Sequence, residues 1–506
     1  MSNDDFEQAL AALTARGPGR MLPDLDRITA LAGLMGDPQL AYPTVHVTGT
    51  NGKGSIVRMV GALCSAAGLS AGTYTSPHLQ SVRERFGLAG RPIGPQRFAD
   101  VHREVEQLAA LVDARIAADW AGEGAPDRVT YFELLTGMAF WWFADVPVDV
   151  GVIEVGMGGR WDATNLVRGD VAVLGPIDVD HTELGTTPEQ VAGEKVGIIK
   201  PGAQVVTARQ TPEVDAIITA AVEQAGAMLW RVGDHVEVVD RSVAVGGQLL
   251  ELRVGERTID EVLLPVYGAH QADNAALALG AFAALTGASF AAMEDDVIRH
   301  GLGAVAIPGR LEIVHRDPTV VLDGAHNPHG AAAAAEALQE SFGFRELVLV
   351  AACFDDKDIA GILGAFAAAA SHVVVTRVDH PRAAPLERMR AVAMEVWGDS
   401  GTVVEVATDI GSALTLAESV AREGDGILVA GSLHTVGAAR DRYLPIGDGT
   451  DDDAVVREPG DLDTDDEELL DVLEDDDAFE AAIEQMLDAA EDLGAGPEAG
   501  DPDDRG

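Results

Sequence analysis

Cysteine, lysine and long apolar runs are scarce or missing in this chain of 506 residues. Its two cysteines, Cys64 and Cys353, are too few for a disulfide framework or a cysteine-based metal site, and we expect both to be small core residues. No uninterrupted apolar run reaches the roughly 18 residues that a membrane-spanning helix needs. The opening residues, MSNDDFEQAL, carry acids where a targeting signal would carry Lys or Arg. These absences predict a cytoplasmic protein with no membrane partner.

Lysine is scarce beside arginine: four lysines, Lys53, Lys195, Lys200 and Lys357, stand against 31 arginines. An ammonium group is compact and can lose its proton, whereas a guanidinium is planar and keeps its charge. Each lysine therefore either performs a task that arginine could not or survives a compositional bias by chance. Both explanations stay open for Lys200 and Lys357, to which no function is assigned.

The negative charge is concentrated at the C-terminal end. The formal net charge is -48, and residues 448–506 hold 25 acidic residues and two arginines, a net charge of -23. Such a segment repels itself and lacks the apolar content of a core, so residues 447–506 are predicted to be a largely disordered tail with at most a loose amphipathic helix. The rest of the chain is also acidic, which argues against nucleic acid as a partner.

Short apolar segments of β type alternate with helical segments along most of the chain. TVHVTG, AGTYTS, DVGVIEVG, DVAVLGPI and AQVVTA form one series, and TVVLDG, ELVLVAAC, HVVVTRV, TVVEVA and GILVAGS form a second. Their continuous hydrophobicity predicts parallel strands covered on both faces. Residues 229–266 predict a small antiparallel sheet, and a Pro-Gly break in AVAIPGRLEIV marks a junction. We therefore expect an N-terminal domain over residues 1–305, a smaller α/β domain over 306–446 and the tail over 447–506.

The segment TVHVTGTNGKGSIVRMV, residues 44–60, predicts a strand, a glycine turn and a helix. Backbone N–H groups at such a helix start point toward an anion, and Lys53 adds a positive charge for the terminal phosphates of a nucleotide. The common P-loop has Gly five residues before its Gly-Lys pair and Ser or Thr directly after Lys. Here Val47 and Gly54 hold those places, and the hydroxyl is delayed to Ser55.

Polar residues also follow other predicted strands. Ser76 and Arg85 lie in and after TYTSPHL, Glu154 lies in the apolar run VIEVG, and His181 follows DVAVLGPI. The carboxyl ends of parallel strands meet at one edge of a sheet, where ligands bind. An unpaired ionised Glu in an apolar strand is costly, so Glu154 requires a partner. An ion pair with Arg160 and a hard metal ion both satisfy that requirement.

TGTNGKGS resembles the nucleotide loop of the Mur-ligase superfamily, and its Gly54-Ser55 ending is similar to the folylpolyglutamate synthase and dihydrofolate synthase branch. The same branch has counterparts of TSPHL with its ER pair, TYFELLT, VGMGGRWDATN, EKVGI, HQADNA, PGR, DGAHNP and GSL, in this order between about Leu25 and Arg442. The resemblance implies an α/β fold with two Mur-ligase-like domains, a P-loop ATPase domain with a parallel sheet and a smaller Rossmann-like domain, followed by the acidic tail.

The resemblance also implies a role for individual residues. ATP would be bound by Asn51, Gly52, Lys53, Gly54, Ser55, Asn274, Arg310 and Asp323. Two Mg²⁺ ions would be held by Ser55, Ser76, Glu154, His181 and Lys195, with Lys195 carrying CO₂ as a carbamate. The folate would contact Phe132, Glu133, Trp161, Asp162 and Ala163. Catalysis would depend on Lys53, Lys195, Arg85 and His326.

The activity implied is an ATP-dependent ligase that adds L-glutamate to a folate carboxylate through an acyl phosphate, acting as a monomer. We favour both dihydrofolate synthase and folylpolyglutamate synthase activity, with folylpolyglutamate synthase activity alone as the alternative. A cell-wall Mur ligase would need an extra domain of roughly a hundred residues, and only 43 residues precede the first predicted strand. A non-catalytic nucleotide switch would need Lys53 but not Glu154, His181 and Lys195 together.

Overall fold

The computed structural model describes residues 2–19, 23–120, 127–179, 182–398 and 400–446. These described residues all belong to one compact unit. The predicted tail and His181 lie outside the described residues. Within the described ranges, no helix is both long enough and apolar enough to cross a membrane.

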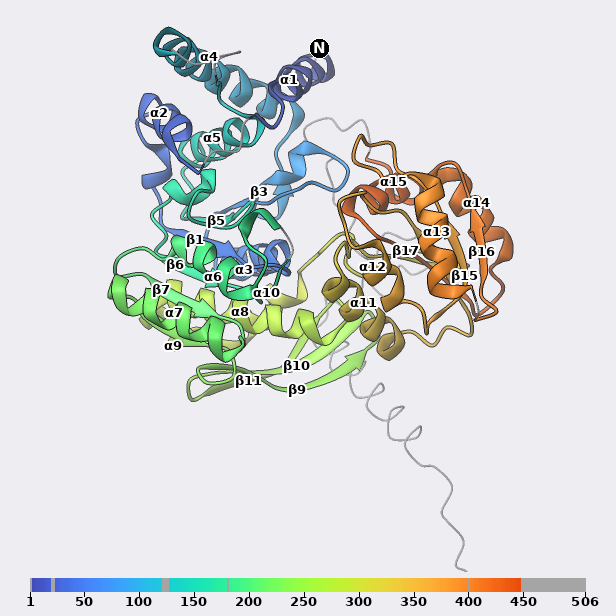
Figure 1. The fold of residues 1–506 in the computed structure, drawn as a ribbon. Helices are drawn as coiled ribbons and strands as arrows, with labels where there is room; N and C mark the ends of the chain where they lie inside the picture. The colour runs from blue at the N-terminus through green and yellow to red at the C-terminus, as the bar shows by residue number, and fades with distance from the viewer. Residues whose placement is uncertain (1, 20–22, 121–126, 180–181, 399, 447–506) are drawn as a thin grey trace, which may run out of the picture. The chain divides into compact units, whose positions relative to one another are not determined.

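The five segments of the first series supply five strands of an eight-stranded sheet (Figure 1), and three further strands complete it. Its order is β4-β3-β2-β5-β1-β6-β7-β8. The strands are β1 (Thr44–Thr48), β2 (Ala71–Tyr74), β3 (Phe86–Leu88), β4 (Arg91–Pro92), β5 (Val150–Glu154), β6 (Val171–Leu174), β7 (Gln204–Thr207) and β8 (Met228–Arg231). β2, β5, β1, β6, β7 and β8 pair in parallel, whereas β3 and β4 form an antiparallel extension at the β2 edge.

Helices cover both faces of this sheet. They are α1 (Ser2–Arg16), α2 (Asp26–Leu34), α3 (Lys53–Ala66), α4 (Pro95–Asp119), α5 (Tyr131–Asp145), α6 (Pro188–Lys195), α7 (Pro212–Ala225), α8 (Ala269–Thr286), α9 (Ala288–Ala291) and α10 (Asp295–Gly303). Valines of β1, β5 and β6 pack on α3, α8 and α10, while the opposite sides of the strands pack on α5, α6 and α7. The predicted burial of the strands on two faces is confirmed. Short 3₁₀ turns η1 (Pro38–Leu40), η2 (Val82–Arg85), η3 (Ala163–Leu166), η4 (Thr182–Leu184) and η5 (Val196–Ile198) connect these elements.

A separate antiparallel sheet contains β9 (Val236–Ala244), β10 (Gly247–Val254) and β11 (Arg257–Leu264). It confirms the predicted antiparallel sheet but is shorter than the predicted range of 229–266. Residues 228–231 instead form β8, which pairs in parallel with β7. Trp230 Nε1 adds a hydrogen bond to Gln204 Oε1 at 3.0 Å, so this segment continues the larger sheet.

The second series forms a six-stranded sheet in the order β12-β13-β17-β14-β15-β16. Its strands are β12 (Glu312–Arg316), β13 (Thr319–Leu322), β14 (Leu347–Ala351), β15 (Ala370–Val375), β16 (Val403–Val406) and β17 (Gly426–Ala430). All pairs are parallel except β12 with β13. The helices are α11 (Pro328–Ser341), α12 (Ile359–Ala365), α13 (Leu386–Trp397), α14 (Ile410–Val420) and α15 (Leu433–Tyr443).

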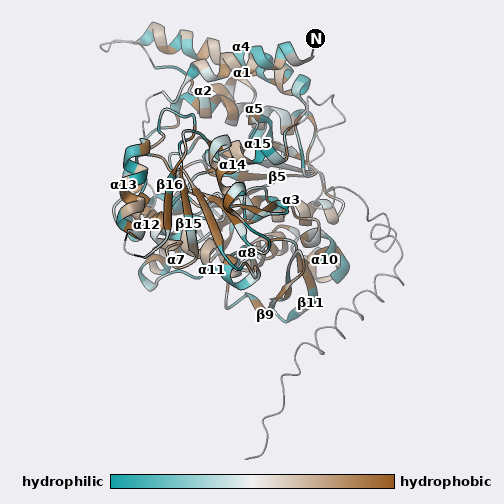
Figure 2. Cartoon of the chain, turned by 90° about the vertical axis from the view of Figure 1, so that its right-hand side faces the viewer, coloured by the Kyte–Doolittle hydropathy of each residue, from teal (hydrophilic) through white to brown (hydrophobic). Residues whose placement is uncertain are grey.

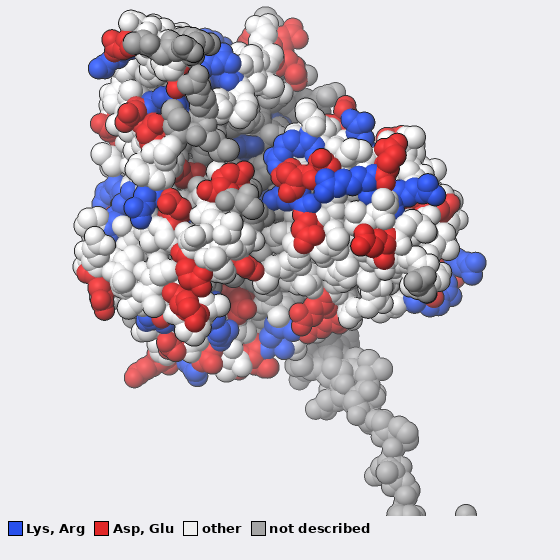
Figure 3. All heavy atoms as spheres, viewed as in Figure 1, with Lys and Arg blue, Asp and Glu red and all other residues white. Residues whose placement is uncertain are grey.

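The six-stranded sheet is also buried on both faces. α11, α12 and α13 pack on one face, and α14 and α15 pack on the other. Its strands are accordingly hydrophobic between more polar helix surfaces (Figure 2). On the molecular face in Figure 3, acidic and basic side chains are interspersed. The sheet begins after the predicted junction at 305/306, and that domain boundary stays a prediction.

Candidate active site

A glycine turn joins β1 to α3, as the sequence predicts. Gly52 caps the start of α3 with a φ of +81°, a left-handed conformation that favours glycine. A Cβ at this position would lie 2.4 Å from Asn274 Oδ1, at the start of α8. The structure therefore brings Asn274, a predicted ATP contact, directly against the glycine turn between β1 and α3.

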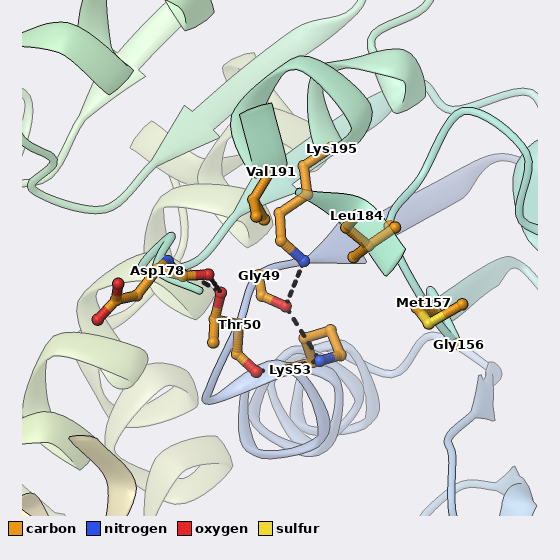
Figure 4. Close-up of a pocket in the computed structure, with 10 residues that line it drawn as sticks. Gly49, Thr50, Lys53, Gly156, Met157, Asp178, Leu184, Val191 and Lys195 are labelled. Carbon is orange, nitrogen blue, oxygen red and sulfur yellow. Dashed lines mark hydrogen bonds between the residues drawn. The ribbon is translucent and has the colours of Figure 1, made fainter. Parts of the chain in front are cut away.

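Two lysine ammonium groups converge on this turn (Figure 4). Lys53 Nζ donates to Gly49 O at 3.0 Å and to Thr50 O at 3.3 Å. Lys195 Nζ, at the end of α6, donates to the same Gly49 O at 2.9 Å, and its side chain is buried. They line a small pocket with the turns after β1, β5 and β6. Paired cations beside backbone N–H groups make this pocket suited to an anion.

Glu154 ends β5 and is buried at 3% exposure. Its Oε2 accepts a hydrogen bond from the Ser76 backbone N–H at 3.0 Å. Burial raises the pKa of Glu154, while the charges of Lys53, Arg310 and Arg58 and the Ser76 hydrogen bond oppose that shift. Arg160 instead donates to Gly193 O at 3.1 Å. The cations that act on Glu154 are therefore Lys53, Arg310 and Arg58, and not Arg160, the partner proposed in the ion-pair hypothesis.

Arg85 lies in η2, close to the Ser76 loop, and is buried. Its Nε donates to His78 Nδ1 at 3.0 Å, and its guanidinium lies 5.7 Å from the centre of the Tyr131 ring. Burial, with the charges of Arg85 and His434, lowers the pKa of His78 to about 3, so this imidazole is a neutral acceptor. The sequence analysis did not assign His78 or Tyr131, although His78 lies inside the TSPHL motif.

The predicted folate residues meet at the turn after β5. Asp162 Oδ2 accepts from the Met157 N–H at 2.9 Å, and a Cβ on Gly156 would lie 2.5 Å from the Phe132 ring. Ala163 is buried in the neighbouring core, whereas Trp161 is 47% exposed. Burial raises the pKa of Asp162 against several hydrogen bonds that lower it. The structure thus brings Phe132, Asp162 and Ala163 to one place and leaves Trp161 at the surface.

Glu133 has a different setting from its neighbour Phe132. Its carboxylate accepts from Arg27 Nε at 3.1 and 3.0 Å, and Oε2 also accepts from the Thr130 N–H at 2.8 Å. Together with Thr130 it forms the capping box of α5. These contacts are structural, and a contact between Glu133 and folate stays a prediction.

Arg310 and Asp323 bring positive and negative charge to the start of the six-stranded sheet. Asp323 Oδ2 accepts from the Leu311 N–H at 3.0 Å, and Oδ1 accepts from the Ala325 N–H at 2.8 Å. Burial raises the pKa of Asp323, and Arg310 opposes the shift. Because Arg310 also acts on Glu154, its charge is shared between carboxylates of the two sheets.

Asn51 of the glycine turn contacts the start of α11. Its Oδ1 accepts from Asn327 Nδ2 at 3.0 Å, and its Nδ2 lies 3.2 Å from His329 Nδ1. Asn327 also caps α11, because its Oδ1 accepts from the Gly330 N–H at 2.7 Å. His326, in contrast, turns back on its own loop, with Nδ1 2.9 Å from Gly324 O. His329 was missed by the sequence analysis, although it directly follows the recognised DGAHNP motif.

The predicted metal ligands are only partly described. Among residues that the structure describes, no three His, Cys, Asp or Glu side chains form a cluster suited to a metal ion. The predicted set depends instead on two serines, Glu154, a modified Lys195 and His181, which lies outside the described residues. Ser76 and Glu154 are adjacent through their hydrogen bond, and Ser55 is buried on the first turn of α3. Their oxygen atoms are the ligand type that Mg²⁺ prefers.

The fold and this site define a class of α/β ligases with a phosphate-binding turn and a separate C-terminal sheet. Residues 309–433 match the Mur ligase, glutamate ligase domain. A dihydrofolate synthase/folylpolyglutamate synthase of Mycobacterium tuberculosis is 43% identical over 83% of this chain and 90% of its own length. The corresponding protein of Bacillus subtilis is 32% identical over 83% and 95%, respectively.

The structure of the Mycobacterium tuberculosis folylpolyglutamate synthase complexed with ADP has a TM-score of 0.82 and 41% identity, covering 88% of this chain and 99% of its own. Escherichia coli FolC in complex with DHPP and ADP has a TM-score of 0.73 and 29% identity, covering 86% and 97%. The chain belongs to the folylpolyglutamate synthase/dihydrofolate synthase family. The recognition of this family from sequence and the predicted Mur-ligase-like fold are confirmed.

Proposed function

We propose that this protein is an ATP-dependent ligase that joins L-glutamate to a folate carboxylate and produces ADP and phosphate. The observation that carries the proposal is the glycine turn before α3, where the cation of Lys53 acts on the buried carboxylate of Glu154. The Lys195 side chain, the proposed carbamate site, reaches the same turn at Gly49 O. A site of this kind suits phosphoryl transfer, in which positioning and charge supply most of the catalysis. The relative whose structure is complexed with ADP supports a nucleotide as a ligand of this protein, and its place at this turn is part of the proposal.

The reaction has two steps. A folate carboxylate oxygen attacks the γ-phosphorus of ATP, the bond from that phosphorus to the β-γ bridging oxygen breaks, and ADP leaves. The amine of L-glutamate then attacks the carbonyl carbon of the acyl phosphate. The bond from that carbon to the phosphate oxygen breaks, phosphate leaves, and the nitrogen loses a proton to complete the amide.

Residues of both sheets bind ATP in this proposal. Asn51, Gly52, Gly54 and Ser55 surround the phosphates, Lys53 neutralises their charge, and Asn274 lies against the turn. Arg310 and Asp323 approach from the second sheet, with Arg310 on the phosphoryl group and Asp323 on the nucleotide. Lys195, Arg85 and His326 complete the catalytic set. An Arg that acts on carboxylates of both sheets can stabilise transferred charge only while the two remain together.

Ser55, Ser76, Glu154, His181 and Lys195 would hold two Mg²⁺ ions, with Lys195 as a carbamate. Two Mg²⁺ ions, when bound, supply positive charge to the transferring phosphoryl group. The fit rests on Glu154, a buried carboxylate whose environment already favours compensation by cations. Lysine suits the carbamate role because a neutral amine can take up CO₂, which a guanidinium cannot. Mass spectrometry of gently handled protein tests the modification, and an unmodified Lys195 in metal-bound crystals would contradict it.

The folate would bind at the turn after β5. Asp162 and Ala163 meet Phe132 there, and Trp161 and Glu133 are the further proposed contacts. We infer that the enzyme accepts both 7,8-dihydropteroate and glutamylated tetrahydrofolate, because relatives are named for both activities. Folylpolyglutamate synthase activity alone is the alternative. In this proposal the protein is a cytoplasmic monomer that acts on small molecules, without a nucleic-acid or membrane partner. Sedimentation of the active enzyme tests whether it is a monomer.

The experiment is ADP release with Mg²⁺, ATP and L-glutamate, in parallel with 7,8-dihydropteroate and with tetrahydrofolate. Turnover with both substrates supports the bifunctional enzyme, and turnover with tetrahydrofolate alone supports the alternative. ADP release that does not depend on L-glutamate would contradict a ligase. Purification in bicarbonate controls for loss of a carbamate during handling.

A further inference from the structure

A histidine lies inside the otherwise apolar central strand of the large sheet. His46 is in β1, between β5 and β6, and its side chain is fully buried. Its Nε2 lies 2.9 Å from Thr164 Oγ1, and Thr164 is itself fully buried. Burying a polar group in such a position costs free energy unless it forms hydrogen bonds, so the hydrogen bond to Thr164 offsets part of the cost of burying His46.

The direction of these hydrogen bonds follows from the number of protons available. Thr164 Oγ1 donates to Asp162 Oδ1 at 2.5 Å, and both oxygens of this carboxyl group also accept backbone N–H hydrogen bonds, from Thr164 and Met157. A hydroxyl has one hydrogen, so Thr164 must accept from His46. His46 is therefore the neutral Nε2–H tautomer. Its Nδ1 has no hydrogen-bond partner among the described residues.

A second, partly buried contact supports the same loop, residues 160–165. Lys200 Nζ donates to Asn165 O at 2.7 Å and to Asn165 Oδ1 at 2.8 Å. Asn165 Nδ2 in turn donates to Arg160 O at 3.0 Å and Gly197 O at 3.1 Å. One contact thus reaches the middle of the loop through Thr164, and the other reaches its first residue through Asn165.

We propose that His46 and Lys200 are positioning residues that hold the loop 160–165, and with it Asp162, in the conformation that binds the pteridine end of the substrate. This inference rests on the proposed function, which places Asp162 in the folate site. Asp162 Oδ1 also accepts from the Thr164 N–H at 3.0 Å, so Thr164 fixes this oxygen twice. The carboxylate orientation is set before substrate arrives, which reduces the ordering that binding requires.

A matched pair of variants at Thr164 tests the proposal in the full-length enzyme. Thr164→Ser keeps the hydroxyl, whereas Thr164→Val removes it at nearly the same volume. Loss of a hydrogen bond to a charged group predicts an increase in the KM for the pteridine substrate of about tenfold in Thr164→Val. We expect less than a threefold change in Thr164→Ser and an unchanged KM for ATP in both variants. Equal pteridine KM values for the two variants would overturn the proposal.

Variants of the histidine and lysine extend the test. His46→Gln keeps an N–H donor near the Nε2 position and should retain a lower pteridine KM than His46→Leu. Lys200→Met should raise the same KM and leave the KM for ATP unchanged. His102→Leu is the matched control, because His102 is a buried histidine of α4 whose neighbouring charged groups are Glu106, Arg16 and Arg103. It should lower thermal stability without raising the pteridine KM, and an increase equal to that of His46→Leu would indicate a general folding effect.

Two further readouts separate positioning from structural damage. In an Asp162→Ala background, Thr164→Val should cause no additional increase in pteridine KM, because it acts through that carboxylate. A full additional increase would overturn the mechanism. Nitrogen-15 NMR of histidine-labelled enzyme should identify His46 as the Nε2–H tautomer, and an Nδ1–H tautomer would overturn the inference even without turnover. Wild-type turnover tests the proposed function separately.

Discussion

At the carboxyl edge of the eight-stranded sheet, functional groups are joined by contacts between distant parts of the chain, whereas at the six-stranded sheet they bond mainly to their own loop. His46 and Thr164 are 118 residues apart, and Lys195 and Gly49 are 146 apart. His326 bonds to a group two residues away and Asn327 to one three residues away, with one long-range contact from Asn327 to Asn51. The first edge depends on the packing of the whole domain, and the second depends on a short motif.

The two sheets contribute different groups to the candidate site. The first edge supplies the paired lysines and Glu154, which are fixed by buried contacts. The second supplies Arg310 and Asn327, which act on Glu154 and contact Asn51, respectively. Groups on the loops of the six-stranded sheet thus reach a site that is fixed by the packing of the eight-stranded sheet. In such an arrangement, the approach of one sheet to the other can be coupled to the reaction.

The largest expected effect comes from removing charge at the first edge. Lys53→Met eliminates an ammonium group that would stabilise the transferring phosphoryl group, and we expect glutamate-dependent ADP release to fall about 100- to 1000-fold. Steady-state kinetics measure the change. Arg168→Met is the control, since Arg168 pairs with Asp170 in a partly exposed ion pair and should leave the rate unchanged. A loss below tenfold in Lys53→Met would contradict its role.

Removing the charge shared between the two sheets should have the next largest effect. Arg310→Met removes a cation that acts on both Glu154 and Asp323, while Lys53 and Arg58 still act on Glu154. We expect kcat to fall about 100-fold with a smaller change in the KM for ATP, because the second sheet then adds no positive charge to the transferring group. Arg310→Lys should recover only part of the rate, because an ammonium group lacks the planar fork of a guanidinium. Equal rates for Arg310→Met and wild type would show that Arg310 does not stabilise charge on the transferring phosphoryl group.

A pH experiment compares His46 with a non-titrating residue. Burial, with a contribution from Lys200, lowers the pKa of His46 from 6.5 to about 3. A depressed folded-state pKa stabilises the fold above the unfolded pKa, and that stability is lost as the pH falls from 6.5 toward 3. At pH 5, His46 should therefore cost the wild type about 2 kcal/mol relative to pH 7.5. Thermal unfolding should show a weaker acid dependence in His46→Gln, and parallel curves would contradict the assigned burial.

The smallest effect is expected where the two edges touch. Asn327→Asp keeps the oxygen that caps α11 but loses the Nδ2–H donor to Asn51. One hydrogen bond is worth about 1 kcal/mol, so the KM for ATP should rise about fivefold while the thermal stability of the protein is retained. Ser412→Ala, which removes only the hydroxyl contact with Asp409 at the start of α14, is a control in the same domain. An unchanged KM in Asn327→Asp would indicate that this contact does not assist nucleotide binding.

Much of the fold could be predicted because most of the parallel strands are continuous apolar runs, whereas β3, β4 and β12 carry no such run and were not predicted. The parallel series and the family resemblance are confirmed, and the roles of the individual site residues stay predictions. The sequence argument that found Glu154, one polar residue in an apolar strand, applies equally to His46 in TVHVTG. His46 and its partner Thr164 are thus residues that the sequence pattern signals and that were not among the predicted site residues.

Local chemistry by itself determined the glycine turn, the capping residues and the order of the motifs, because these depend on neighbouring residues. Only the tertiary structure decided that Lys53 and Lys195 donate to one carbonyl oxygen and that Arg27 donates to the Glu133 carboxylate. It also decided that His46 is linked to Asp162 through Thr164. Each of these contacts joins residues far apart in the chain. Their distances are set by how strands and helices pack, which no local pattern encodes.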